Sequence, residues 1–211
     1  MPEAKAWIPV RRSPLSARSP IEARRGAVHL AEMPFIGKHI LRIDPKAGAA
    51  AVKKATGLEL PTTPLSTTVA DEAALLWLGP DEWMLVTPPD DAGAIAAKLA
   101  GALSSKHHQL VDVGDYYTAI DVHGLKAREL LMKLTVLDIH PRAFAAGQVT
   151  GTNFGHANAT LWLVSDIDGD ATFRLFVRWS HADYLWCLLA DAGLEWGMPE
   201  QHPVSGEKMV I

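Results

Sequence analysis

The amino-acid sequence predicts an α+β fold of two pseudo-repeated ferredoxin-like β-α-β-β-α units in one compact body. Two observations support this fold class. Apolar residues follow the same order of strand and helix spacings in each half, and a Leu-Trp-Leu run occurs in both, at 76–78 and 161–163. The 211 residues are also enough to bury a core. Within this single structural domain we expect an extended basic N-terminal arm at 1–25, a first α+β half at 26–116, a second α+β half at 117–197 and a flexible tail at 198–211.

The first half begins with a strand and a helix. Pro45 favours a helix start and Gly57 a helix end. In a second helix, Ile95, Leu99 and Leu103 recur every four residues, which places them on one face. In chain order we expect a strand at 37–44, a helix at 45–57, a loop at 58–72, a hairpin at 75–86, a helix at 89–105 and a strand at 107–115.

The hairpin at 75–86 reads LLWLGPDEWMLV, and its two apolar runs show no alternation. Gly79 and Pro80 mark the turn. A strand with one face in water alternates apolar and polar residues, so both faces of this hairpin need cover. We expect that cover to come from a second unit packed sheet to sheet or from another subunit.

The second half repeats the pattern. Leu130, Leu134 and Leu137 share one side of its first helix, and Gly193 ends its second. In chain order we expect a strand at 117–124, a helix at 125–138, a long loop at 140–157, a hairpin at 160–177 and a helix at 181–193.

Composition restricts the class of protein. Hydrophobic residues make up 48% of the chain and charged residues 21%, and no uncharged run reaches the roughly 18 residues of a membrane span. The N-terminus lacks the apolar core of a secretory signal, so we expect a cytoplasmic protein. A net charge of −4 argues against a basic nucleic-acid binder. One cysteine, Cys187, excludes an internal disulfide and a cysteine-based metal cluster.

The basic arm departs from this average. Residues 1–25 carry six Lys or Arg and two Glu, a net charge of +4, so the remaining residues carry −8. Its prolines and its lack of a helical or strand period predict an extended segment. Three interpretations stay open, namely a frayed tail, a docking arm on an acidic partner surface, and an organelle transit peptide.

The residue types that carry chemistry form no complete motif. The nine histidines include no His-x-His or His-Glu-x-x-His, so no metal site is expected. The aspartates of 166–170 lack the glycine position of a calcium loop and indicate a hairpin turn. Cys187 lies in an apolar helix without a cationic neighbour in sequence, which is typical of a core thiol. For Asp112, Asp115 and Asp121, a role in capping or turn formation is a better interpretation than general acid–base catalysis.

Longer motifs are more specific. The first half contains WLGPDEW, LRID ahead of a helix, and TGLELP, at 77–83, 41–44 and 56–61. The second half contains DVGDYYTAIDVHGLKARELLMKLTVLDIHPRAFAAGQ and FVRWSHADYLWCLLADAGLEWG, at 112–148 and 176–197. Over residues 27–197 the chain resembles the gamma-subunit family of heterotetrameric sarcosine oxidase.

The resemblance implies a non-catalytic subunit with a structural and assembly role. That oxidase converts sarcosine, oxygen and water to glycine, formaldehyde or methylene-tetrahydrofolate, and hydrogen peroxide. Its alpha, beta and delta subunits would be the partners and would hold FAD, FMN, NAD, folate and zinc, while this chain would hold no cofactor or metal. No nucleic-acid or membrane partner is expected, and the isolated chain could form a homo-oligomer. The implied fold is similar to the folate-binding domain of the T-protein (aminomethyltransferase) family.

Asp183 keeps an alternative function open. It falls near the place of the catalytic aspartate in the T-protein helix, which makes it the one candidate for folate binding in this chain. The hairpin at 165–170 lacks the Gly-Gly-x-x-x-Asp-Asp pattern of that family, and the following strand ends in Val177-Arg178-Trp179 without the asparagine. The alternative is a free-standing T-protein-like folate-binding aminomethyltransferase.

Overall fold

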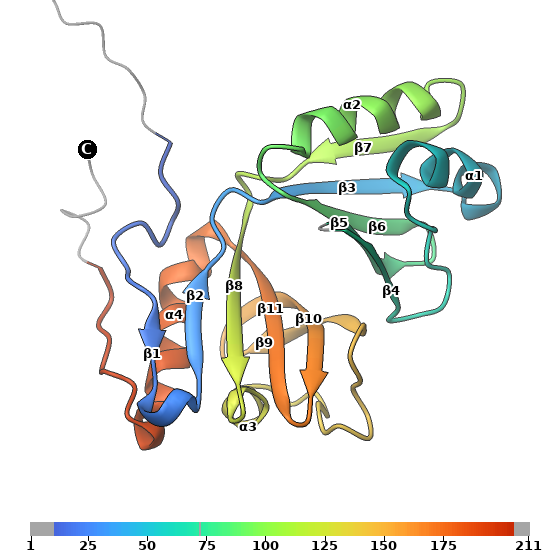
Figure 1. Cartoon of the computed structure of the whole chain (residues 1–211). Helices are drawn as coiled ribbons and strands as arrows, with labels where there is room; N and C mark the ends of the chain where they lie inside the picture. Colours follow the sequence, from blue (N-terminus) through green and yellow to red (C-terminus); the bar gives the residue numbers. More distant parts are fainter. Residues whose placement is uncertain (1–10, 72, 205–211) are drawn as a thin grey trace, which may run out of the picture.

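The structure, a computed structural model, describes residues 11–71 and 73–204 and contains two antiparallel sheets (Figure 1). The six-stranded sheet has the order β1-β2-β8-β11-β10-β9, and the five-stranded sheet the order β4-β5-β6-β3-β7. The strands of the six-stranded sheet are β1 Ile21–Glu22, β2 His29–Glu32, β8 Tyr117–Gly124, β9 Val149–Phe154, β10 Ala157–Ile167 and β11 Asp170–Arg178. Those of the five-stranded sheet are β3 Gly37–Ile43, β4 Thr67–Ala70, β5 Ala73–Gly79, β6 Glu82–Thr87 and β7 His108–Asp112.

Helices cover the outer face of each sheet (Figure 1). The helices are α1 Pro45–Thr56, α2 Ala92–Leu103, α3 Ala127–Met132 and α4 Trp179–Ala192, and two 3₁₀ turns are η1 Arg24–Gly26 and η2 Leu194–Trp196. The first two helices pack on the five-stranded sheet, and α3 and α4 pack on the six-stranded sheet. α1 starts as predicted, because Asp44 accepts a hydrogen bond from the Lys46 N–H and Pro45 follows it, and it ends at Gly57 in a left-handed conformation.

The apolar hairpin at 75–86 forms β5 and β6, and both of its faces are buried. Leu75, Trp83 and Leu85 pack into the cluster beneath α1 and α2. The alternate residues pack between the two sheets, where Leu76, Met84 and Val86 meet Trp162 and Phe176 of the other sheet. The six-stranded sheet of the same chain therefore supplies the cover that the missing alternation required.

Each half contains a strand that we expected to be loop. β4 lies within 58–72 and β9 within 140–157, and both are edge strands of their sheets. Their sequences, TTVA and VTGTNF, are short and polar, so they lack the apolar alternation that marks a strand. In the six-stranded sheet the place beside β8 is taken by β2, which lies in the first half ahead of its first expected strand at 37–44. The ferredoxin-like repeat as such stays a prediction.

The helix expected at 125–138 is shorter in the structure. α3 ends at Met132, and the chain leaves the helix at Lys133. The reason lies in Thr135, whose hydroxyl accepts a hydrogen bond from the Leu137 N–H at 3.2 Å. A side-chain bond of this kind replaces the helical backbone pattern with a turn. Leu134 and Leu137 lie outside the helix, but both still pack against the core, as expected for apolar residues.

The described part of the basic arm, residues 11–25, packs against the body of the chain (Figure 1). Leu15 is 1% exposed and joins the core under the six-stranded sheet, and Ile21 of β1 pairs with Leu30 of β2. Met198 anchors the start of the C-terminal segment in the same core. Residues 1–10 of the expected arm and 205–211 of the expected tail lie outside the described residues, and the predicted boundaries at 25 and 197 stay predictions.

A buried lysine lies on β3. Lys38 is 1% exposed, and its Nζ donates to the Ile36 carbonyl oxygen at 2.8 Å. Burial, together with the Arg11 cation, lowers the pKa of Lys38 from 10.5 to about 8, although nearby carboxylates act in the opposite direction. The charged ammonium is therefore less stable in the folded chain than in the unfolded chain.

Replacing Lys38 by methionine is expected to raise the free energy of unfolding at pH 7 by about 2 kcal/mol, after subtracting the lost hydrogen bond to Ile36. Since the folded pKa is below the unfolded one, the unfolded chain binds more protons between pH 8 and 10.5. Wild-type stability should therefore rise over this window, and the advantage of the variant should disappear by its upper end. Urea unfolding across the window, with exposed Lys98→Met as control, tests this. An advantage independent of pH would contradict it.

Candidate functional site

Asp183, the one folate candidate, lies in the second turn of α4 and forms an ion pair with the arm. Arg18 donates to Asp183 Oδ1 from Nε at 2.9 Å and from Nη2 at 2.6 Å. Asp183 Oδ2 accepts a hydrogen bond from the Val204 N–H at 2.9 Å. The side chains of Arg18 and Asp183 are only 9% and 15% exposed. Both carboxylate oxygens of Asp183 are thus used by the chain itself.

The same guanidinium reaches three further acceptors. Nη1 of Arg18 donates to Gln201 Oε1 at 2.9 Å. Nη2 donates to the His202 carbonyl oxygen at 2.7 Å and to Cys187 Sγ at 3.2 Å. Arg18 therefore ties the arm, α4 and the C-terminal segment together, and these three segments lie side by side in Figure 1.

Cys187 differs from the core thiol that its neighbours in sequence indicated. It is half-buried, and Arg18 brings a cation to it from 169 positions away in the chain. Burial raises the pKa of the Cys187 thiol, with Asp183 acting in the same direction, and Arg18 only partly opposes this. The thiol is consequently the neutral form at physiological pH, and not an activated nucleophile.

Two cavities flank the arm at this position. One, of about 420 Å³, is lined by residues 12–14, 16 and 17 of the arm and by Trp179, Ser180, Asp183 and Val204. The other, of about 240 Å³, is lined by Arg18, Leu15, Pro34 and Trp186 among others. Trp186 is 1% exposed, and its indole N–H has no acceptor among the described residues.

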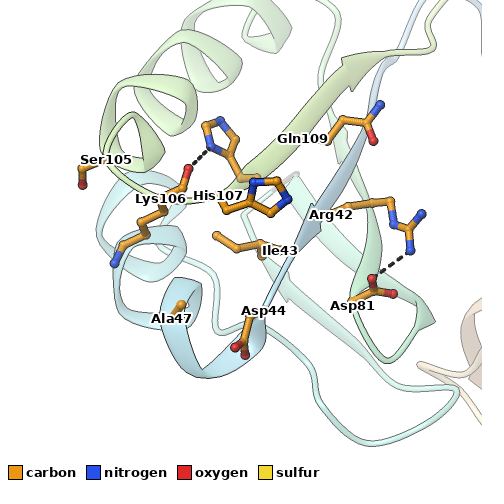
Figure 2. A pocket seen from close by; sticks show the side chains of 10 residues that line it. Arg42, Ile43, Asp44, Ala47, Asp81, Ser105, Lys106, His107 and Gln109 are labelled. Carbon is orange, nitrogen blue, oxygen red and sulfur yellow. Dashed lines mark hydrogen bonds and ion pairs between the residues drawn. The ribbon is translucent and has the colours of Figure 1, made fainter.

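A larger groove, of about 980 Å³, lies at the end of the five-stranded sheet (Figure 2). Four of its eight polar side chains are engaged in the fold. Arg42 donates to Asp81 at 2.8 Å, and Asp44 caps α1. His108 Nδ1 donates to the Lys106 carbonyl oxygen at 2.9 Å. His107 precedes β7 and His108 begins it, and both line this groove.

The other acidic candidates are not brought together. Asp121 accepts two hydrogen bonds from Arg174, each 2.7 Å long. Asp112 accepts the Gly114 N–H, as a turn residue does, and Asp115 makes an exposed ion pair with Arg11. Each of these aspartates thus has a separate structural role.

The loop at 166–170 is the turn between β10 and β11. Asp166 pairs there with Arg128, and Asp168 and Gly169 adopt left-handed conformations. Over residues 11–71 and 73–204, no three His, Cys, Asp or Glu side chains are placed to hold a metal ion. No helix in this described part of the chain is long and apolar enough to cross a membrane.

Sequence reasoning identified Asp183 but not its partner. Arg18 is one of several arginines in the arm, and nothing in the local pattern distinguishes it from Arg11 or Arg12. The informative signal was the acid itself, since a carboxylate that is buried in the fold needs a cation.

Comparison with known proteins gives a consistent result. The family model described as "Sarcosine oxidase, gamma subunit family" matches residues 42–195. The curated sarcosine oxidase subunit gamma of Corynebacterium sp. strain U-96 is 31% identical over 177 residues, which cover 82% of this chain and 83% of that protein.

Two solved structures have related folds. The heterotetrameric sarcosine oxidase from Corynebacterium sp. U-96, in complex with pyrrole 2-carboxylate, contains a chain that matches with a TM-score of 0.79 and 28% identity, covering 91% of this chain and 99% of that one. The glycine cleavage system aminomethyltransferase T from Bartonella henselae matches with a TM-score of 0.58 and 15% identity, over 76% of this chain and 44% of that one. The second likeness shows a common fold.

Proposed function

Because the chain belongs to the sarcosine oxidase gamma subunit family, we propose that it is a structural subunit of a heterotetrameric flavin-dependent sarcosine oxidase. Its partners in this proposal are the alpha, beta and delta subunits, in a cytoplasmic complex. One observation of this chain carries the structural role. Asp183, the carboxylate nearest to a catalytic position by resemblance, is saturated by Arg18 and Val204.

The chemistry in this proposal takes place on the partner subunits. They would oxidise sarcosine with oxygen and water to glycine, hydrogen peroxide and either formaldehyde or methylene-tetrahydrofolate, using FAD, FMN, NAD, folate and zinc. This chain supports the complex by presenting a folded body whose two sheets already bury each other's inner faces. Contacts with partners would then fall on its outer faces and edges.

The free-standing aminomethyltransferase is the weaker alternative. The chain corresponds to 44% of the solved aminomethyltransferase, and its candidate acid is bound to its own arm. A homo-oligomer of the isolated chain is a further outcome of the test. Native mass measurement of the tagged chain, purified from its host, should give a yellow complex with three different companions. A colourless monomer or homodimer would contradict the proposal.

Asp183→Asn provides a test at the residue level. The amide oxygen can still accept a hydrogen bond from Arg18, so the complex should assemble, although with a lower melting temperature. Sarcosine turnover per bound flavin should stay within about twofold of wild type, because the residue makes no contact with the reacting atoms in this proposal. A loss of about 100-fold with normal flavin content would instead place Asp183 in an active site.

A further inference from the structure

A surface of arginine and aromatic side chains lies where the arm crosses one end of the six-stranded sheet. Arg12 of the arm and Trp179 of α4 line the same cavity, and the Trp179 N–H donates to the Tyr116 carbonyl oxygen at 3.0 Å. The guanidinium of Arg178, the last residue of β11, lies 5.4 Å from the centre of the Tyr116 ring. We call these four residues, Arg12, Tyr116, Arg178 and Trp179, the arginine patch.

The fold makes little use of the side chains of the arginine patch. Tyr116 is 47% exposed, both arginines are exposed, and Trp179 is half-buried. Within residues 11–71 and 73–204, the side chains of Arg12 and Arg178 have no hydrogen-bond or ion-pair partner. Tryptophan, tyrosine and arginine are the residue types enriched among those that dominate the binding energy of protein–protein interfaces. The composition of the patch is therefore that of a binding surface.

The charge left over at the arginine patch is positive. Two carboxylates lie beside it, and both are already paired, Asp183 with Arg18 and Asp115 with Arg11. The cations of Arg12 and Arg178 therefore lack a counter-charge in this region. Complementary charges guide the encounter of two proteins and fix their register, so this surface fits a partner that presents carboxylates.

The cavity beside the arginine patch has room for an apolar side chain. Its volume is about 420 Å³, and Pro14, Ala17 and Trp179 give it apolar walls. Its one carboxylate, Asp183, is neutralised by Arg18. Interfaces commonly combine a large apolar anchor in a pocket with charged groups at the rim, and the cavity and the two arginines have this arrangement.

We propose that the arginine patch is the docking surface for an acidic segment of a partner subunit, and that an apolar side chain of this segment occupies the cavity. The inference rests on the proposed function, since the partner is another subunit of the oxidase. The described part of the arm keeps its place and forms one side of the surface. Of the three interpretations open for the basic arm, this one assigns it to docking, through a folded surface.

The first test reverses the charge of the patch in the whole complex. Tagged Arg12→Glu/Arg178→Glu and wild type are purified from the host, and mass spectrometry quantifies the other oxidase subunits retained per tagged chain. We expect at least about tenfold less retention in the variant, because its carboxylates would face those of the partner. Lys54→Glu/Lys98→Glu, the same charge change at exposed positions of α1 and α2, should stay within about twofold of wild type.

The second test identifies the acidic group of the partner. Arg12→Lys and Arg178→Lys keep the charge and introduce an amine, which a carbodiimide joins to a carboxylate in contact with it. Peptide mass spectrometry of the treated complex should show position 12 or 178 linked to an Asp or Glu of another oxidase subunit. Lys54 and Lys98 of the same chain are internal controls and should form no link to another subunit.

A third variant tests the apolar anchor. Ala17 is exposed and lines the cavity, so Ala17→Trp should fill part of the cavity without altering the charges. Retention of the other subunits should fall by at least about fivefold, because the anchor side chain can no longer enter. Retention equal to that of wild type would show that the cavity is not part of the contact.

The outcomes separate this proposal from the proposed function. Wild type without other oxidase subunits would overturn both. Wild type that retains its subunits, with equal retention in Arg12→Glu/Arg178→Glu or equal loss in the lysine control, would overturn the docking surface alone. If the reversed variant melts more than about 2 °C below wild type as an isolated chain, the carbodiimide link decides. No link, or a link within the chain or to a second copy of it, would overturn the docking surface.

Discussion

Trp83→Ala is expected to lower the free energy of unfolding by about 4 kcal/mol. Trp83 is fully buried and lies in the cluster between the five-stranded sheet and its helices. The substitution leaves a large cavity there, because the neighbouring strands are held in register and can collapse only partly. It also removes the Nε1 donor that bonds the Pro61 carbonyl oxygen at 2.7 Å. Urea unfolding of the full chain measures the effect.

Two neighbouring substitutions divide this effect into its parts. Trp77 pairs with Trp83 across the hairpin but is only partly buried, so Trp77→Ala should cost about 1–2 kcal/mol. Trp83→Phe keeps a six-membered ring in the site but loses the hydrogen bond to Pro61 and the volume of the five-membered ring, for a similar cost. A smaller loss for Trp83→Ala than for Trp77→Ala would show that the site does collapse around the cavity.

The hairpin also shows how far the sequence can be used. An apolar run on both strands required cover on both faces, and this followed from the period of a strand alone. The start of α1 at Pro45 and its end at Gly57 could also be predicted, because both depend on local backbone chemistry. Strand β8 and helix α4 likewise agree with their apolar patterns within two residues.

The features that the sequence did not reveal depend on contacts across the chain. β4 and β9 are edge strands whose polar residues give no strand period, and pairing with β5 and β10 orders them. The Arg18–Asp183 pair joins residues 165 positions apart, so no local spacing can indicate it. Cys187 was assigned to the core for the same reason, because its neighbour Arg18 is distant in sequence.

Arg128→Met is expected to lower the free energy of unfolding by about 3 kcal/mol. Arg128 lies on α3 with 8% of its surface exposed. Its guanidinium donates to Asp166 and to the carbonyl oxygens of Ile139 and Phe144, and it lies 5.1 Å from the centre of the Phe173 ring. Methionine fills much of the same volume but leaves a carboxylate and two carbonyl groups without their donor.

The decisive comparison for Arg128 is a double-mutant cycle. Arg128→Met/Asp166→Leu removes both partners of the pair. Its loss of unfolding free energy should be smaller than the sum of the losses in the two single variants, by roughly 1 kcal/mol or more. Lys126→Met, which breaks an exposed pair with Glu129 on the same helix, should cost less than about 0.5 kcal/mol. Additive single effects would mean that Arg128 stabilises the chain through its two carbonyl contacts, and that Asp166 contributes little.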